Sequence, residues 1–382
     1  MRHIFAFAAS FAWLFISAQP FSIGERSITF FDDSRNRSVP VDLYYPAAAA
    51  GTNTAFASGE FPVLVVGHGF VMAPDAYGNL WDRFVPRGYI LALPTTEGGF
   101  LPNHGNFGAD LAFIGAAIVA ANEDAGSPLY QHVQPSVALM GHSMGGGAAF
   151  LGAANNAAIR TVVTLAPAET NPSAVSAAAN VQVPTLVFAG SNDCVTPIPD
   201  HAGPIFDAVT ASCRAFVNIT GGGHCFFAEN NFNCSFGELT CSPTPSISRG
   251  AQHDLVNDFA GLWLDHFLKD DPSALETFRD SADLSTRAVS TIVCALSTGL
   301  AVERVGEGVR IFPVPASSEV RIEGLSGTAE LSLLDICGRT VVPWTRLAAD
   351  GAFPIGHVPD GSYQLELKDG PRFVSKRLVV SR

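Results

Sequence analysis

The chain is poor in positive charge. Only three of its 382 residues are lysine, and 22 Lys and Arg stand against 35 Asp and Glu, so the formal net charge is −13. A chain with this excess of negative charge lacks the basic surface that binds nucleic acid or an anionic membrane, and we expect neither as a partner. The stretch 305–382 is electrically balanced, so the negative excess lies upstream of it.

Other features are missing as well. No C-x-x-C pair and no Cys/His grouping has the spacing of zinc ligands, so we predict no metal and no cofactor. No apolar run beyond the N-terminal region predicts a transmembrane helix, so we expect no stable membrane insertion. The sequence contains no internal repeat and no low-complexity tract.

The first 18 residues have the pattern of a secretory signal peptide. A short polar start, Arg2 and His3, precedes an apolar run over 4–16, and small residues follow at Ser17 and Ala18. Seven cysteines in an exported chain predict disulfides, and an odd number leaves at least one unpaired. We therefore expect a secreted monomer.

Apolar runs alternate with helical stretches from about residue 60 to 270, which predicts an α/β fold with a mostly parallel, doubly wound sheet. An antiparallel hairpin (27–31 with 39–45) precedes it at the sheet edge, and a helix over 252–268 closes it. The expected strands are 61–66, 89–93, 137–140, 161–165, 183–189 and 215–219, with a helix over 110–122. We predict a catalytic domain at 19–272, a linker at 273–308 and a small all-β sandwich at 309–382.

The most informative motif is Gly141-His142-Ser143-Met144-Gly145, which lies between the strand 137–140 and a Gly/Ala-rich helical segment. A G-x-S-x-G turn between strand and helix is the nucleophile elbow of α/β-hydrolases. The pattern predicts Ser143 as the nucleophile, with the Met144 N–H as one donor of the oxyanion hole. His142 is on the wrong side of the elbow to serve as the base, and we expect it to line the cleft and contact substrate.

The remaining catalytic groups follow strands in the order that this fold requires. Asp193 closes the turn that follows the strand at 183–189 and is the predicted acid, with Asp200 as its rival. His224 follows the strand at 215–219 and three glycines, and is the predicted base. Its rival, His253, lies on a predicted helix away from any strand end.

The second oxyanion donor is expected from the loop after the strand 61–66. That loop reads Gly67-His68-Gly69-Phe70, and the Phe70 N–H is the candidate.

Residues 25–270 resemble the secreted dienelactone-hydrolase-like branch of α/β-hydrolases, which includes bacterial cutinases and poly(ethylene terephthalate) hydrolases. The motifs that carry the resemblance are Tyr44-Tyr45-Pro46-Ala47, Gly67-His68-Gly69-Phe70, Gly141-His142-Ser143-Met144-Gly145-Gly146-Gly147, Gly190-Ser191-Asn192-Asp193 and Gly222-Gly223-His224. The resemblance implies a Ser143, Asp193 and His224 triad, Phe70 and Met144 as oxyanion donors, an aromatic substrate contact from Phe70, and an ester substrate.

The chain departs from that family at one point. Polyester hydrolases usually place a tryptophan after the strand that follows the nucleophile helix, where this chain has Ala166-Pro167-Ala168-Glu169. Ester hydrolysis is unaffected, whereas an aromatic polyester substrate is less well supported. A small-ester or lipid acyl esterase, a thioesterase, a peptidase and a non-catalytic binding protein on this scaffold stay open as alternatives.

Cysteine pairing is also open at this stage. Cys194 follows the acid and Cys225 follows the base, so a bridge between them would join the two catalytic loops, as some polyester hydrolases do nearby. Cys194–Cys213 competes with it, and Cys234–Cys241 could close a small loop. Six cysteines allow 15 full pairings.

The C-terminal stretch is similar to type IX secretion sorting domains. Three motifs carry this similarity in order: Phe312-Pro313-Val314-Pro315-Ala316, Leu334-Asp335-Ile336-Cys337-Gly338-Arg339 and Pro359-Asp360-Gly361-Ser362-Tyr363. The resemblance implies the type IX secretion machinery as a partner, export across an outer membrane, and removal of the tail with its odd Cys337. A substrate-binding β-sandwich is the alternative.

Overall fold

The structure is a computed structural model that describes residues 20–294, 310–325, 329–335, 340–347, 351–369 and 372–382. The described residues group into two compact units, one ending at 294 and one beginning at 310. The predicted signal peptide, most of the second tail motif and Cys337 lie outside the described residues.

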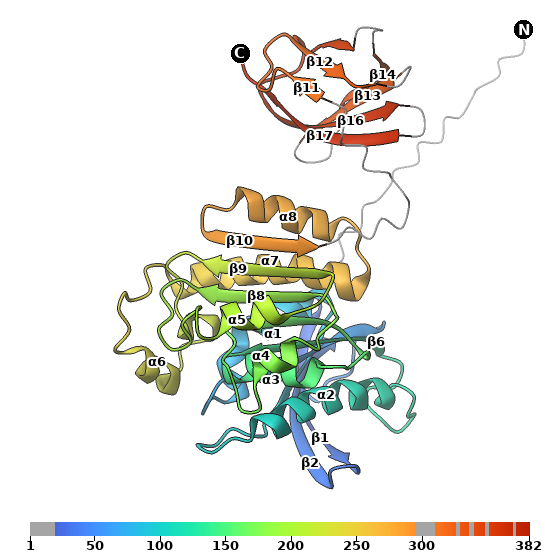
Figure 1. Cartoon of the computed structure of the whole chain (residues 1–382). Helices are drawn as coiled ribbons and strands as arrows, with labels where there is room; N and C mark the ends of the chain where they lie inside the picture. The colour runs from blue at the N-terminus through green and yellow to red at the C-terminus, as the bar shows by residue number, and fades with distance from the viewer. Residues whose placement is uncertain (1–19, 295–309, 326–328, 336–339, 348–350, 370–371) are drawn as a thin grey trace, which may run out of the picture. The chain divides into compact units, whose positions relative to one another are not determined.

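The first unit is built on a ten-stranded sheet in the order β10-β9-β8-β7-β6-β4-β5-β2-β1-β3 (Figure 1). Strands β5, β4, β6, β7, β8 and β9 run parallel to one another, whereas β2 pairs antiparallel with β5 and forms an antiparallel hairpin with β1 near one edge. The strands are β1 Ser22–Asp32, β2 Arg37–Ala47, β3 Gly51–Thr52, β4 Phe61–Gly67, β5 Ile90–Pro94, β6 Val133–His142, β7 Ile159–Leu165, β8 Thr185–Gly190, β9 Cys213–Ile219 and β10 Ala288–Cys294. This arrangement is the α/β-hydrolase fold, as predicted.

Helices cover both faces of this sheet. The α-helices are α1 Gly78–Phe84, α2 His104–Ala121, α3 Met144–Ala153, α4 Ala174–Ala178, α5 Ala202–Ala208, α6 Phe232–Glu238, α7 Arg249–Lys269 and α8 Ala274–Leu284, with short 3-10 segments η1 Pro74–Tyr77, η2 Val85–Arg87 and η3 Cys225–Phe227. Because successive side chains of a strand point to opposite faces, β4 alternates between two cores: Val63 and Val65 lie in one, and Leu64 and Val66 in the other.

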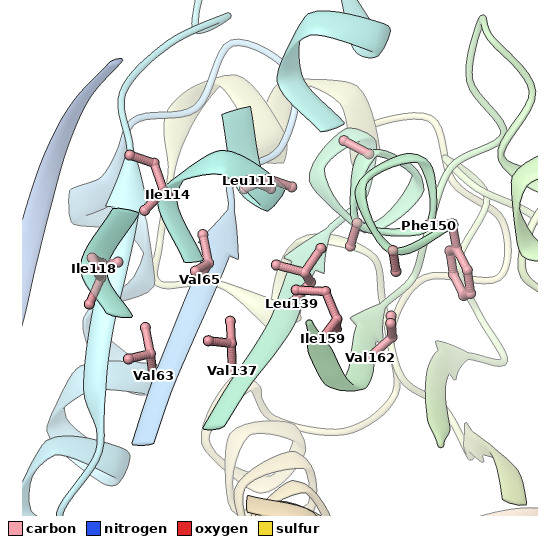
Figure 2. Packing of buried hydrophobic residues seen from close by; sticks show 14 of the residues in the cluster. Val63, Val65, Leu111, Ile114, Ile118, Val137, Leu139, Phe150, Ile159 and Val162 are labelled. Carbon is pink, nitrogen blue, oxygen red and sulfur yellow. The ribbon is translucent and has the colours of Figure 1, made fainter. Parts of the chain in front are cut away.

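The first core lies under α2 and α3. Figure 2 shows Leu111, Ile114 and Ile118 of α2 above Val63 and Val65 of β4. By length and composition alone α2 could cross a membrane, but these side chains are buried in the sheet-facing core. We therefore regard α2 as a core helix.

The segment that carries Ser143 approaches β4 closely. A Cβ on Gly145 would lie 2.2 Å from the carbonyl oxygen of Gly67, and a Cβ on Gly141 would lie 2.2 Å from that of Gly145. Both obstacles are backbone atoms, which cannot rotate away as a side-chain tip can. Three backbone segments therefore cross at van der Waals distance, and glycine is required at the crossing.

The segment 273–308, predicted as a linker, differs from that expectation in its first part. It contains α8, which buries Ala274, Phe278 and Ala282 at a spacing of four residues, and β10, which pairs antiparallel with β9. A disulfide between Cys213 and Cys294 joins the two strands. The helical repeat is short and the strand is exposed at alternate positions, so neither stood out in the sequence.

The second unit is all-β, as predicted. It contains a three-stranded sheet in the order β11-β12-β15 and a four-stranded sheet in the order β14-β13-β16-β17. Its strands are β11 Arg310–Phe312, β12 Glu319–Glu323, β13 Ala329–Asp335, β14 Thr340–Arg346, β15 Ala352–Pro354, β16 Gly361–Asp369 and β17 Arg372–Val380. Buried side chains from both sheets, such as Val320 and Leu331, share one core.

The glycine crossing gives a stability prediction. Gly145→Ala forces the backbones apart and should lower the free energy of unfolding by about 3 kcal/mol or more, as overpacking at a rigid site does. Gly250→Ala on α7 is the matched control, since a Cβ there has nothing within 4 Å. Urea unfolding followed by circular dichroism measures both; equal midpoints for the two variants would contradict the packing argument.

Candidate active site

The candidate groups gather at one edge of the sheet. Gly67 ends β4, His142 ends β6 and Gly190 ends β8, and these strands run parallel, so their carboxyl ends meet at the same edge. Ligand sites of open α/β sheets form in the crevice outside this edge. The loops after β4, β6, β8 and β9 carry the residues that the sequence singled out.

Ser143 occupies a strained turn between β6 and α3. Its φ of 55° and ψ of −119° lie in a region that non-glycine residues rarely adopt. Surrounding backbone holds it there: its N–H donates to Leu165 O at 3.0 Å, and its carbonyl oxygen accepts from Gly147 N at 3.1 Å and Ala168 N at 2.9 Å. The serine side chain makes no hydrogen bond with any residue that the structure describes.

Two backbone N–H groups near this turn are open. Met144 is the first residue of α3, so its N–H has no acceptor within the helix. The Phe70 N–H likewise has no hydrogen-bond acceptor among the described residues, although Gly69 before it and Met72 after it both donate. These are the two N–H groups that the sequence analysis named as candidate oxyanion donors.

Asp193 and His224 form a buried pair. Asp193 Oδ2 lies 2.7 Å from His224 Nδ1, and both side chains are almost completely buried. Asp193 Oδ1 accepts hydrogen bonds from Val195 N and Thr196 N, both at 2.8 Å. Burial alone would raise the pKa of the Asp193 carboxyl, but the His224 hydrogen bond and charge, with the Thr196 donors, hold it below its usual value. Asp193 is therefore an ionised acceptor that fixes the His224 ring.

Thr196 is a site residue that the sequence analysis missed. Its Oγ1 lies 2.9 Å from Asp193 Oδ2 and 3.0 Å from His224 Nδ1, so the hydroxyl touches both members of the pair. A hydroxyl three residues after an aspartate is a common turn feature, which is the signal that could have identified it.

Gln252 of α7 was missed as well. Its side chain is fully buried, and it accepts from Gly223 N at 3.0 Å and donates to Gly223 O at 2.9 Å. Both backbone groups of Gly223, the residue before His224, are thus hydrogen-bonded to the Gln252 side chain. A Cβ on Gly190 would lie 2.5 Å from Gly222 O, so the loop that carries the base also packs tightly on the end of β8.

His142 corrects one expectation. The sequence places it in the cleft, but its ring is fully buried and both nitrogens have partners. Nε2 lies 3.1 Å from His224 O, a carbonyl, so this nitrogen donates; Nδ1 then accepts from the Tyr77 hydroxyl at 3.0 Å. Tyr77 in turn accepts from Gly69 N at 2.7 Å. His142 therefore links the elbow to the neighbouring loops, and its ring is buried where the sequence predicts a cleft-lining position.

The disulfides also differ from the expected pairings. Cys194 pairs with Cys241, Cys225 with Cys234, and Cys213 with Cys294. The bridges proposed from the sequence, Cys194–Cys225, Cys194–Cys213 and Cys234–Cys241, are therefore wrong. Cys194, after Asp193, and Cys225, after His224, are each bonded to the segment that carries α6. The spacing of the cysteines could not reveal this, because that segment folds back onto both loops.

The two rival residues lie elsewhere. Asp200 is exposed and makes no contact with His224. His253 lies on α7 and its Nε2 is 3.2 Å from Ala228 O. Among the described residues, no group of three or more His, Cys, Asp or Glu side chains is placed to hold a metal ion.

The buried His142 ring gives a pH prediction. Burial lowers the pKa of His142 from 6.5 to about 3, with the nearby His224 charge acting in the same direction. As pH falls from 6.5 towards 3, the unfolded chain gains a proton that the folded chain excludes, so stability falls, by on the order of 4 kcal/mol over the whole interval.

His142→Gln is the variant that isolates this effect, because an amide can still donate to His224 O and accept from Tyr77 but does not titrate. Urea unfolding at pH 7, 5.5 and 4.5 should show a smaller loss of stability with acid for His142→Gln than for the parent chain. Identical losses would show that His142 is not the group concerned.

Comparison with known proteins finds one matching family model and several named relatives. A family model described as PET hydrolase-like matches residues 12–242. Cutinase 2 of Thermobifida cellulosilytica is 31% identical over 225 residues, which are 58% of this chain and 77% of that protein. Cutinase cut1 of Thermobifida fusca is 31% identical over 225 residues, which are 58% of this chain and 63% of that protein.

The bis(hydroxyethyl) terephthalate hydrolase of Streptomyces coelicolor is 24% identical over 206 residues, which are 52% of this chain and 59% of that protein. This chain thus spans about three fifths of that relative's length. The family model covers more than half of the chain and ends close to Cys241, within the unit that contains the site. The chain belongs to the PET hydrolase-like family.

Proposed function

We propose that the protein is a secreted serine hydrolase of carboxylic esters that works through an acyl-enzyme. One observation carries the proposal: a buried Asp193–His224 pair at 2.7 Å stands on loops beside a serine in a strained elbow. The residue before that serine, His142, packs against His224 with ring centroids 4.8 Å apart. An ionised acid, an oriented imidazole and a serine in a strained elbow are the parts that a serine esterase needs.

In the proposed reaction, Ser143 Oγ attacks the ester carbonyl carbon while His224 Nε2 removes its proton. His224 then gives that proton to the leaving alcohol. Water, activated by the same nitrogen, releases the acid from Ser143. Asp193 accepts from Nδ1–H throughout, which keeps Nε2 free to act as base and stabilises the imidazolium.

The tetrahedral oxyanion is bound by two N–H groups, those of Phe70 and Met144. Neither has an acceptor among the described residues, and the Met144 N–H lies at the N-terminus of α3, where the helix dipole favours negative charge. Close packing at Gly67 and Gly145 fixes the spacing of the two loops that supply these donors.

Polyesters are the proposed substrate class, on the strength of relatives named as cutinases and as a terephthalate ester hydrolase. The stretch Ala166–Pro167–Ala168–Glu169 offers no aromatic side chain to a terephthalate ring, which favours aliphatic over aromatic polyesters. Small esters, thioesters and peptides are the competing classes, and a panel of nitrophenyl esters beside polyester films separates small esters from polyesters.

We also propose an export route. The signal-like stretch 1–18 would direct the chain across the inner membrane, and the all-β unit from 310 onward would serve as the sorting domain of type IX secretion. The domain boundaries follow the same reasoning, with the catalytic unit extended to Cys294 by α8 and β10.

The decisive variants are Ser143→Ala and His224→Gln. Each should lower kcat/KM for nitrophenyl butyrate by several orders of magnitude, about 10⁶ in a fully triad-dependent enzyme, because the attacking or proton-accepting group is gone. Asp200→Asn and His253→Gln are the matched controls and should turn over the ester at parental rates. Parental activity in Ser143→Ala would refute the proposal.

A further inference from the structure

Helix α6 has an unusual surface. None of its residues is buried, and Phe232 and Phe236, with Leu239 at its C-terminal end, are 83, 67 and 72% exposed. These three side chains follow one another at spacings of four and three, which places them on one face of the helix. A surface helix ordinarily turns such a face to the core. Figure 1 shows α6, in olive, standing away from the sheet.

Covalent bonds hold α6 in place where apolar packing does not. Cys225–Cys234 joins it to the residue after His224, and Cys194–Cys241 joins the segment after it to the residue following Asp193. Glu238 Oε1 accepts from Cys225 N at 3.2 Å. The exposed face is therefore fastened to the two loops that carry the acid and the base.

The same helix touches the oxyanion loop. Asn233 Nδ2 donates to Val71 O at 2.8 Å, next to Phe70. Phe70 is half exposed and meets the exposed Phe100 edge to face, with centroids 6.5 Å apart. Leu101 beside Phe100 is almost fully exposed. We call this set the apolar rim: Phe70, Phe100, Leu101, Phe232, Phe236 and Leu239.

We propose that the apolar rim docks the enzyme on the surface of a condensed, uncharged polyester, with α6 as its outer part. The proposal rests on the esterase function above. The Asn233–Val71 hydrogen bond and both disulfides attach α6 to the segments that carry Phe70, Asp193 and His224, so the rim adjoins the site. A net charge of −13 favours a neutral polymer over an anionic lipid surface.

The test separates docking from chemistry. Phe232→Ser, Phe236→Ser and Leu239→Ser are combined in one variant, and Phe31→Ser, Leu284→Ser and Val289→Ser in a control that removes as many exposed apolar side chains from β1, α8 and β10. Each is made in the full chain with and without Ser143→Ala. The Ser143→Ala forms report adsorption to a poly(ε-caprolactone) film, and the active forms report turnover of film and of soluble nitrophenyl butyrate.

The rim variant should adsorb about tenfold less, and its ratio of film to soluble turnover should fall by about the same factor, since exposed apolar area drives adsorption. The control should keep both values. Equal adsorption of rim variant and parent, an equal loss in the control, preferential binding to phosphatidylglycerol vesicles, or a rim-dependent dimer in solution would each overturn the docking proposal. Absent soluble turnover in the parent would refute the esterase function and leave the adsorption result intact.

Discussion

The arrangement of the site depends on the close crossing of glycine backbones at the carboxyl edge of the sheet. Gly145 of α3 meets the Gly67 carbonyl at the end of β4, and Gly190 at the end of β8 meets Gly222 of the base loop. No side chain fits at either point, so the loops after β4, β6, β8 and β9 take positions set by backbone contact. Such contacts are rigid, which suits a site whose groups must be placed within fractions of an ångström.

Buried hydrogen bonds also fix the positions of these loops. Gln252 pairs with both backbone groups of Gly223, and His142 joins the elbow to Tyr77 and to the His224 carbonyl. A buried donor or acceptor without a partner costs about 1–3 kcal/mol, so loop positions that break these hydrogen bonds are unfavourable. The outer segment that carries α6 has few such contacts, and disulfides to Cys194 and Cys225 take their place.

The sequence was sufficient for those parts that depend on local pattern. The parallel strands, the α/β-hydrolase fold, the elbow at Ser143 and the placing of Asp193 and His224 at strand ends followed from apolar runs and glycine positions. The starts and ends of elements moved by a few residues; α2 begins at His104 because Asn103 caps it, with its side chain accepting from Asn106 N.

The parts that depend on distant contacts could not be predicted. Gln252 lies 29 residues from Gly223, and the sequence around a glutamine in a helix does not indicate which distant backbone groups it will bind. The environment of His142 depends on Tyr77 across 65 residues, so its exposure was misjudged. Disulfide pairing failed for the same reason. We missed α8 and β10 because a helix of 11 residues with three buried side chains and a half-exposed edge strand resemble a linker.

We propose Ser143 as the nucleophile, activated by His224. Labelling of the full chain with a fluorophosphonate, followed by peptide mass mapping, tests this most directly because the probe bonds only to an activated serine. We expect one label per chain on the peptide that contains Gly141 to Gly145, and its loss when His224 is replaced by Gln. Ester hydrolysis by a chain that takes no label, or a label on another serine, would contradict it.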